Sequence, residues 1–241
     1  MLIYGVSDLY AKVFAGPPWN ETTKCSTSGS YYGPESQAGL PCPDCSIPLS
    51  EAYPQAETAS YILSELGKAN PIGLLAFINN ELAGFSWGYQ TTPDKLVESK
   101  WKTPKMKLKV KNLLAEYGVT DQLFFGSETG VDPKFRGKNV GKELVESRLR
   151  RILRTGENYV LVRTNIDSPM YGICKYTAGF EQILGPVADK PLFSKKWGKK
   201  YKYVNAIDEE NVDRVLFLYN DRAKKAAEYY DFPNPGWYGS H

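Results

Sequence analysis

The amino-acid sequence predicts an α/β or α+β sandwich, in which helices cover a sheet. Three observations support this prediction. Apolar runs at residues 72–78 and 82–89 flank an Asn-Asn turn, which indicates a β-hairpin. Strand and helix patterns alternate from residue 122 onwards. Residues 140–153 have apolar side chains at helical spacing, which predicts an amphipathic helix. We expect residues 1–241 to form a single domain, because a chain of this length can bury a substantial core.

The N-terminal part contains two predicted helices and a long irregular segment. Residues 7–15 are expected to form a short helix with Ser7 as its N-cap, ended by a Gly-Pro-Pro triplet. Residues 17–50 are rich in Gly, Ser, Pro and Cys and have no regular period, so something other than a hydrophobic face should hold this insert. Residues 51–66 carry the apolar stripe of a second helix.

The remaining elements follow from the same periodicities. After the hairpin we expect one or two helices in 95–117, a strand at 122–131, the long helix, a strand at 159–163, a short helix at 169–178, and strands at 180–183 and 192–197. Residues 208–230 are expected to close the chain as a helix or helix pair, within a helical extension over 205–241. On the long helix, Arg148 is expected to face solvent with the other arginines.

Composition and charge argue against several kinds of protein. The net charge of +3 is too small to indicate binding to nucleic acid or to a membrane surface. The longest apolar runs are too short to span a bilayer, and no basic leader precedes an apolar stretch, so we expect a cytoplasmic protein. A lysine-rich run at 195–200 is interpreted as a solvated surface loop rather than a nucleic-acid patch, because acidic residues follow at 208–210.

A loop rich in glycine and basic residues joins a predicted strand to the long helix. The free amides and the positive dipole end of a helix N-terminus favour an anion such as a pyrophosphate. Gly137 and Gly141 let the backbone approach this anion, and Arg136, Lys138 and Lys142 add positive charge. The alternative interpretation is an ordinary turn with basic side chains.

The hexapeptide RGKNVG at residues 136–141 resembles the cofactor motif of the GNAT acetyltransferase superfamily, which is Gln or Arg, two residues, Gly, one residue, and Gly or Ala. Asn139 replaces the usual middle glycine, a mild departure because Asn tolerates left-handed backbone angles. Downstream, a strand, Asn165, a short helix with tyrosines and a Gly-Phe pair follow in the order typical of this family. The resemblance covers roughly residues 53–197 and the first helix.

The resemblance implies a GNAT-like, mostly antiparallel central sheet with a splayed parallel strand pair, flanked by helices. It also implies transfer of an acetyl group from acetyl-coenzyme A to an amine, with the pantetheine arm between the splayed strands. The cofactor-binding residues are then expected to be Thr129, Gly130, Val131, Arg136, Gly137, Lys138, Asn139, Val140, Gly141, Lys142 and Asn165. Asn165 has an alternative interpretation as a loop or helix-cap residue.

The same resemblance suggests the groups that move protons. Glu128 lies three residues before Val131, where many family members carry a general base that acts directly or through water. Its alternative interpretation is a strand residue on a solvated face. A backbone N–H near Gly130 or Val131 would polarise the thioester carbonyl.

The general acid for the leaving thiolate is less well defined by the sequence. The family places a Tyr four residues before the Gly-Phe pair, where this chain has Lys175. We favour Tyr176, one residue later, although such a shift rotates a helical side chain by about 100°. Tyr171 is the alternative, and either tyrosine could simply pack in the core. Lys175 itself is a less natural donor.

Cys42 and Cys45 form a CxxC motif, with Cys25 upstream. The sequence leaves three interpretations open: a structural zinc site, reduced thiols or a disulfide. Zinc usually takes four ligands, so Asp44, Glu21 or water would have to complete the site. A metal would explain how an insert without a regular period stays folded.

The insert falls where the family borders its acceptor site, which suggests that it shapes the acceptor pocket. Trp19, with Tyr31 and Tyr32, would form one wall, and Trp87 and Tyr89 would form the other. The acceptor is expected to be a small-molecule or peptide amine, and the protein a monomer or homodimer. A different class remains open: a non-catalytic acyl-coenzyme A sensor or interaction protein with the same fold.

Overall fold

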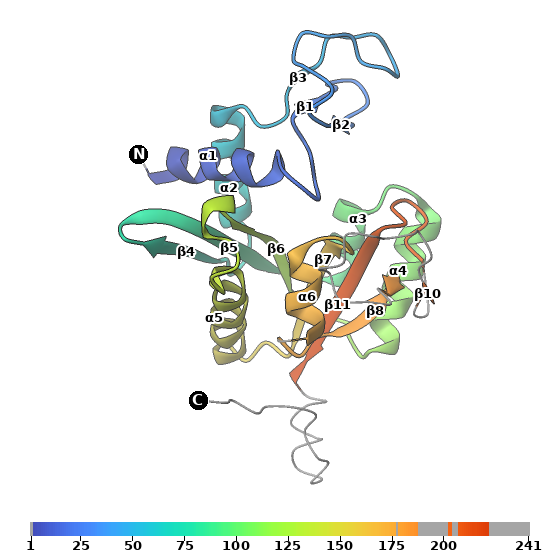
Figure 1. Ribbon diagram of the computed structural model, residues 1–241. Coiled ribbons are helices and arrows are strands. Elements are labelled where there is room, and N and C mark those ends of the chain that lie inside the picture. The colour runs from blue at the N-terminus through green and yellow to red at the C-terminus, as the bar shows by residue number, and fades with distance from the viewer. Residues whose placement is uncertain (1, 177, 188–201, 204–206, 222–241) are drawn as a thin grey trace.

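A six-stranded sheet with the order β4-β5-β6-β7-β11-β8 organises the protein (Figure 1). The computed structural model describes residues 2–176, 178–187, 202–203 and 207–221. The strands are β4 Ile72–Ile78, β5 Glu81–Thr91, β6 Leu123–Val131, β7 Tyr159–Asn165, β11 Arg214–Asn220 and β8 Glu181–Leu184. Neighbouring strands are antiparallel except β6 and β7, which are parallel. The predicted fold class, a mixed and mostly antiparallel sheet flanked by helices, is therefore confirmed.

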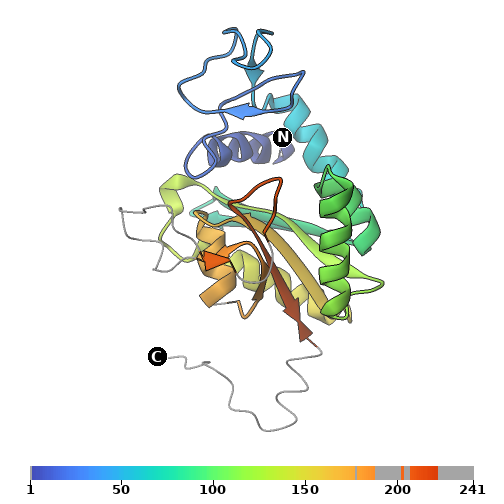
Figure 2. The ribbon, with the colours of Figure 1, turned by 90° about the vertical axis from the view of Figure 1, so that its right-hand side faces the viewer.

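Helices cover both faces of this sheet (Figures 1 and 2). One face carries α1 Leu2–Phe14, α2 Gln55–Leu66, α3 Pro93–Lys100 and α4 Pro104–Glu116, and the other carries α5 Val140–Arg154 and α6 Pro169–Tyr176. The alternation of strand side chains produces these two layers. Phe125 and Leu161 pack towards α3 and α4, whereas the adjacent Phe124 and Val160 pack towards α5 and α6.

Several predicted elements are confirmed. The hairpin of β4 and β5 forms, with Leu75 opposite Phe85. The helical region after it is broken before Pro104, where Thr103 caps α4 by accepting a hydrogen bond from the Met106 amide. Helix α5 begins at Val140 as expected.

Two predictions at the chain ends are wrong. Ser7 is not an N-cap, because α1 begins at Leu2 and the Ser7 hydroxyl donates to the Ile3 carbonyl inside the helix, at 2.9 Å. The expected closing helix is instead strand β11 over Arg214–Asn220, inserted between β7 and β8. Its residues 215–218 are at most 2% exposed, and a short apolar run buried on both faces has no period that separates strand from helix. The strand expected at 192–197, the lysine run at 195–200 and residues 222–241 lie outside the described residues.

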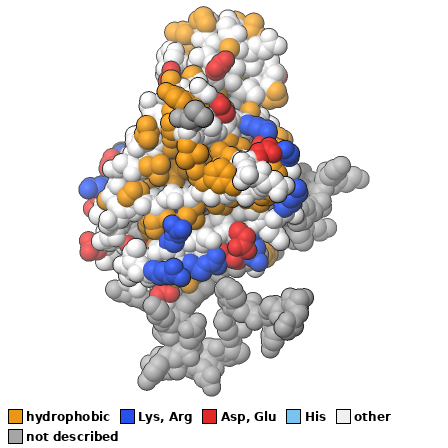
Figure 3. All heavy atoms as spheres, turned by 90° about the vertical axis from the view of Figure 1, so that its left-hand side faces the viewer, with side chains coloured by type: hydrophobic (Ala, Val, Ile, Leu, Met, Phe, Trp, Pro, Cys, Tyr) orange, Lys and Arg blue, Asp and Glu red, His pale blue; other side chains and the backbone are white. Residues whose placement is uncertain are grey.

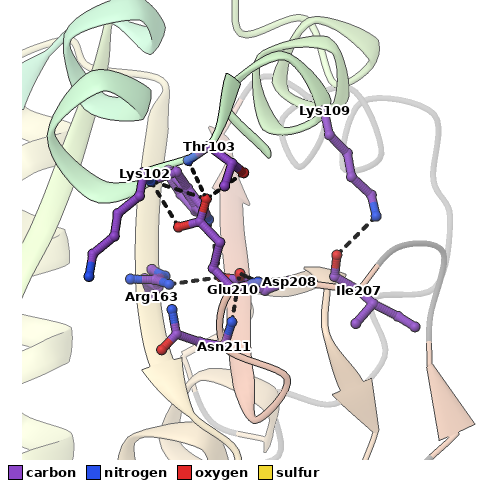
Figure 4. Close-up of polar contacts among 9 residues, drawn as sticks. Lys102, Thr103, Lys109, Arg163, Ile207, Asp208, Glu210 and Asn211 are labelled. Carbon is purple, nitrogen blue, oxygen red and sulfur yellow. Dashed lines mark hydrogen bonds and ion pairs between the residues drawn. The ribbon is translucent and has the colours of Figure 1, made fainter. Parts of the chain in front are cut away.

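A loop that precedes β11 is anchored against the connection between α3 and α4 (Figure 4). The Glu210 carboxylate accepts hydrogen bonds from the Lys102 and Thr103 amides, at 2.8 and 2.6 Å. The buried Asp208 carboxylate accepts from Arg163 Nη2 at 2.8 Å and from Trp101 Nε1 at 3.1 Å. These bonds fix the N-terminal end of β11 beside the C-terminal end of β7.

The insert forms a small sheet of its own at the top of Figure 1, beyond α1 and α2. Its strands are β1 Thr23–Lys24, β2 Tyr31–Tyr32 and β3 Ser50–Glu51, in the antiparallel order β2-β1-β3. A second short pair joins β9 Pro186–Val187 to β10 Lys202–Tyr203.

Hydrophobic side chains gather on the face that carries α1 and the edge strand β4, with lysines and arginines around them (Figure 3). Exposed large apolar residues include Leu2, Leu63 and Phe77. None of the helices in the described ranges is long and apolar enough to cross a membrane.

Candidate active site

The parallel strands β6 and β7 pair over one short stretch and then diverge (Figure 1). Their register covers only Phe124–Gly126 of β6 and Val160–Val162 of β7. Beyond it, β6 follows β5 to Val131 while β7 follows β11 to Asn165. The expected splayed pair is therefore present, and its two inner edges face a gap.

Two adjoining cavities occupy this region. The first, which we call the loop cavity, has about 340 Å³ and lies against residues 129–131, 135–137 and 139–142. The second, the carboxylate cavity, has about 200 Å³ and lies against residues 125–129 of β6 and 162–164 of β7. Trp19, Thr129, Ser168 and Met170 line both cavities, so the two spaces share one wall.

The loop between β6 and α5 has the backbone of an anion site. Gly137 and Asn139 have φ angles of 78° and 62°, so Asn139 does adopt the left-handed conformation. Its side chain does not cap α5. Within the described part of the chain, no acceptor takes the amide hydrogens of residues 137–142. The predicted row of free amides at a helix N-terminus is therefore present and lines the loop cavity.

The other predicted cofactor residues divide into two groups. Thr129, Gly130 and Val131 line the loop cavity. At Gly130 a Cβ atom would lie 2.4 Å from the Phe85 ring, so only glycine fits there. Asn165 lines neither cavity, and its side-chain oxygen accepts from the Asp167 amide at 2.8 Å, which agrees with the alternative interpretation of a turn residue.

The three basic side chains of the loop differ in placement. Arg136 and Lys142 line the loop cavity. Lys138 does not, and its ammonium group lies 5.4 Å from the centre of the Phe135 ring. Arg136 Nε donates to the Val131 carbonyl at 3.3 Å.

Glu128 projects into the carboxylate cavity from β6. The β5–β6 ladder contains a bulge at this point. Glu128 lies opposite Trp87 and Gly126 lies opposite Gly88, so Ser127 between them has no partner on β5. Tyr61 donates to the Glu128 carboxylate at 3.2 Å. Burial raises the pKa of Glu128 to about 7, although Lys100 and Tyr61 lower it in part. A carboxylate with this pKa can accept a proton at neutral pH.

Arg148 is buried, so the expectation that it faces solvent with the other arginines of α5 is wrong. It is 1% exposed, and its Nη1 donates to the carbonyls of Trp87 and Glu128 at 2.8 and 3.1 Å. A Cβ atom at Gly126 would lie 2.6 Å from its Nη2, so this glycine makes room for the guanidinium group. Burial lowers the pKa of Arg148 to about 10. Arg148 thus satisfies carbonyls at the bulge between β5 and β6.

Replacing Arg148 with Met is expected to lower the free energy of unfolding by about 2–4 kcal/mol, because buried carbonyls would lose their donor. Urea denaturation at neutral pH measures this. Arg150→Met, on the exposed side of the same helix, is the matched control and should change stability by less than about 0.5 kcal/mol. Equal stability of the two variants would show that Arg148 has no such role.

The two tyrosines proposed as general acids do not reach either cavity. Tyr176 is 59% exposed on the outer side of α6. Tyr171 is fully buried, and its hydroxyl accepts from Lys175 at 2.8 Å and donates to Gln182 at 3.3 Å. The cavity-lining tyrosines are Tyr10 and Tyr53, from α1 and from the residues before α2.

Of the residues expected around the acceptor, only Trp19 lines the cavities. Trp87 is 3% exposed and stacks on Phe85, with ring centres 4.8 Å apart. Tyr89 packs in the core beneath α3 and α4. Trp87 and Tyr89 are both buried because they lie on the face of β5 that α1 to α4 cover.

Sequence reasoning missed several lining residues. Lys100, Arg163 and Arg214 bring positive charge to the carboxylate cavity, and Glu21 adds a second carboxylate. Glu21 accepts a hydrogen bond from the Tyr53 hydroxyl, and burial raises its pKa. No local motif marks these residues, since they come from distant parts of the chain.

The three N-terminal cysteines come together. The Sγ atoms of Cys25, Cys42 and Cys45 all lie within 4.8 Å of one another, and all three are free thiols. Of the additional ligands considered, Asp44 accepts a hydrogen bond from Tyr32 at 2.7 Å beside this cluster. Glu21 instead lies at the carboxylate cavity.

Comparison with solved structures returns N-acetyltransferases among the matches. A mosquito arylalkylamine N-acetyltransferase is 14% identical over 90% of this chain and 94% of its own, with a TM-score of 0.48. A polyamine N-acetyltransferase of Drosophila melanogaster is 15% identical over 90% of this chain and 96% of its own, with a TM-score of 0.46. A PaiA N-acetyltransferase of Thermoplasma acidophilum, in complex with coenzyme A, is 9% identical over 90% and 92%, with a TM-score of 0.46.

No protein-family model and no curated protein matches this sequence. Likenesses as distant as those to the three solved structures do not assign a function.

Proposed function

We propose that this protein is an N-acetyltransferase that transfers the acetyl group of acetyl-coenzyme A to an amine. The observation that supports this most is the position of Glu128, a half-buried carboxylate with a pKa of about 7, which lines the carboxylate cavity directly beside Thr129, a residue of the wall that the two cavities share. A base for the amine and a site for a diphosphate are thus adjacent.

The residues of the loop cavity fit coenzyme A by the chemistry of their donors. The free amides of residues 137–142 would bind the diphosphate, with Arg136 and Lys142 adding charge. The inner edge of residues 129–131 would hold the extended arm of the cofactor. When bound, acetyl-coenzyme A supplies an activated acyl group as a thioester.

In the carboxylate cavity, Glu128 would remove a proton from the ammonium form of the acceptor or from the attacking amine. Tyr61 orients this carboxylate through its hydrogen bond. The backbone N–H of Val131 is the proposed donor to the carbonyl oxygen, because the Gly130 amide, two residues before the Asp132 amide that donates to Ala83, faces β5. Tyr171 and Tyr176 take no part in this proposal, because neither lines a cavity.

The function is tested by measuring thiol release from acetyl-coenzyme A across a panel of amines, together with calorimetry for coenzyme A. We expect thiol release that depends on an acceptor and binding of coenzyme A without one. Absence of coenzyme A binding would overturn the proposal, and binding without turnover on any amine would favour the sensor alternative.

We further infer that the acceptor carries a negative charge beside its amine, as an amino acid does. Arg214 lines the carboxylate cavity and stacks 4.6 Å over the centre of the Trp19 ring, with no ion pair to a carboxylate in the described residues. Arg163 also lines it, and its buried Nε has no hydrogen-bond partner there. The Arg214 guanidinium group is therefore suited to a carboxylate, whereas Arg163 already donates through Nη2 to Asp208 and adds positive charge beside it.

Replacing Arg214 with Met is accordingly expected to raise KM for amino-acid acceptors by about 10- to 100-fold, because a charge-assisted hydrogen bond is lost. The KM for an uncharged alkylamine should stay the same, and this comparison serves as the internal control. Steady-state kinetics on the two acceptor types measures the difference. A wild-type preference for polyamines would contradict the inferred charge.

A further inference from the structure

Two turns in the insert have the same backbone structure. The first begins at Cys25 and the second at Cys42, 17 residues later. In the first turn the Cys25 amide donates to the Ser30 carbonyl and the Gly29 amide donates to the Cys25 carbonyl, each at 2.9 Å. In the second turn the Cys42 amide donates to the Ile47 carbonyl and the Ser46 amide donates to the Cys42 carbonyl, each at 2.8 Å.

The match extends to backbone angles. The fifth residue of each turn has a positive φ, 69° at Gly29 and 62° at Ser46. A non-glycine residue in this conformation is uncommon, so the second turn keeps its shape in spite of a cost. In the second turn the fourth residue is Cys45, and in the first turn the equivalent residue is Ser28.

Ser28 is placed as a ligand of the same site would be. Its side chain interacts with both Cys25 and Tyr32, and the Ser30 amide donates to its Oγ at 3.2 Å. The corresponding amide of the second turn, that of Ile47, lies near the Cys45 side chain. Paired turns of this kind, each with ligands at its first and fourth residues, present four side chains to one point.

The sulfur positions suit a metal ion better than a disulfide. Cys25 Sγ and Cys45 Sγ are 3.4 Å apart, whereas a disulfide requires about 2.05 Å. In a tetrahedral zinc site with Zn–S bonds of about 2.3 Å, two sulfurs lie about 3.8 Å apart. The Ser28 amide also donates to Cys25 Sγ at 3.4 Å, as expected around a thiolate.

The insert has only a small hydrophobic core of its own. Its buried hydrophobic cluster consists of Cys25, Cys42 and Leu49, with Tyr32 packed against it. Its strands are two residues long. Small units of this size generally need a disulfide or a metal.

We propose that the insert binds one Zn²⁺ through Cys25, Cys42 and Cys45, with an oxygen ligand at Ser28 in the fourth position. Ser28 thus occupies the place of a fourth cysteine in a pair of equivalent turns. The alternative fourth ligand Asp44 is the third residue of its turn and is held by Tyr32. The site is separate from both cavities, so this proposal does not depend on the acetyltransferase activity.

The test is a gain of function at Ser28. The full chain is purified in the presence of Zn²⁺ under reducing conditions, and metal is measured by elemental analysis. We expect one zinc per chain, and its loss in Cys42→Ser. Substitution with Co²⁺ should give sulfur-to-cobalt charge-transfer absorption, and Ser28→Cys should increase its intensity by about one third, because a fourth thiolate joins three.

The matched control is Ser26→Cys, which adds a thiol in the same turn at an exposed residue. Its cobalt spectrum should equal that of the wild type, and only Ser28→Cys should hold zinc more tightly against a chelator. Failure of Cys42→Ser to fold does not affect this comparison, because Ser28→Cys and Ser26→Cys each add a thiol and remove no ligand from the three cysteines. A wild-type chain without zinc, or identical spectra for Ser28→Cys and Ser26→Cys, would overturn the proposal.

Discussion

Glu128→Gln is expected to lower kcat for amine acetylation by at least about 10²-fold and to leave the affinity for coenzyme A unchanged. Glutamine keeps the shape of the side chain and can still contact Tyr61, but it cannot accept a proton. The loop cavity, where coenzyme A is proposed to bind, contains no part of Glu128. Steady-state kinetics and calorimetry on the same preparations measure the two quantities. An undiminished rate would remove Glu128 from the reaction.

The pH dependence provides a further check on the same residue. The base acts in its deprotonated form, so kcat/KM of the wild type should rise with pH and level off above about 7, the pKa of Glu128. The residual activity of Glu128→Gln should lack this step.

Ionisation of Glu128 is also expected to change the free energy of unfolding. Because burial raises the pKa of Glu128 from 4.5 in the unfolded chain to about 7, the folded state binds the proton more tightly. Ionisation therefore destabilises the fold progressively between these values and fully above pH 7. Glu128→Gln should be more stable than the wild type at pH 8 and similar to it at pH 4, which would show that lost activity does not come from unfolding.

Gly141→Glu is expected to weaken binding of coenzyme A by about 100-fold, because a carboxylate near the proposed diphosphate site adds a repulsion of roughly 3 kcal/mol. Gly141 is the second residue of α5 and lines the loop cavity. An acidic residue in the first helical turn is favourable for the helix, so the fold should be kept. A new Cβ would meet only the flexible end of Ile173, at 3.3 Å, and Val131, at 3.5 Å.

The control for Gly141→Glu is Arg150→Gln, which changes the net charge by the same amount on the exposed side of the same helix. Calorimetry with coenzyme A measures both variants. Tight binding by Gly141→Glu would place the diphosphate elsewhere, and equal weakening by Arg150→Gln would indicate a general effect of charge.

The parts of the site that the sequence predicted are those with a local cause. The loop amides, Gly137 and Asn139 belong to one strand–loop–helix segment, whose conformation depends on its own residues. Glu128 was found because it lies a fixed distance from that segment along one strand. The hairpin of β4 and β5 was likewise predicted from adjacent residues.

The parts that were missed depend on tertiary structure. Arg148 lies at helical spacing from Leu144, Val145 and Ile152 on the apolar side of α5, but only the carbonyls of Trp87 and Glu128 at the bulge between β5 and β6 explain how a guanidinium group is buried there. Arg214 belongs to β11, whose apolar residues show no strand period because both faces are covered. Tyr176 illustrates the limit of a motif: a shift of one residue along α6 leaves it at the surface.

The short pairing of β6 with β7 also has a mechanical consequence. The central sheet consists of two three-stranded halves, β4-β5-β6 and β7-β11-β8, joined by a seam of three residue pairs. A ligand whose amide groups lie in the open part of the seam would extend the ladder and join the halves. Two hydrophobic clusters already bridge the seam on either face of the sheet, so such a ligand would complete the ladder between halves that are held in place.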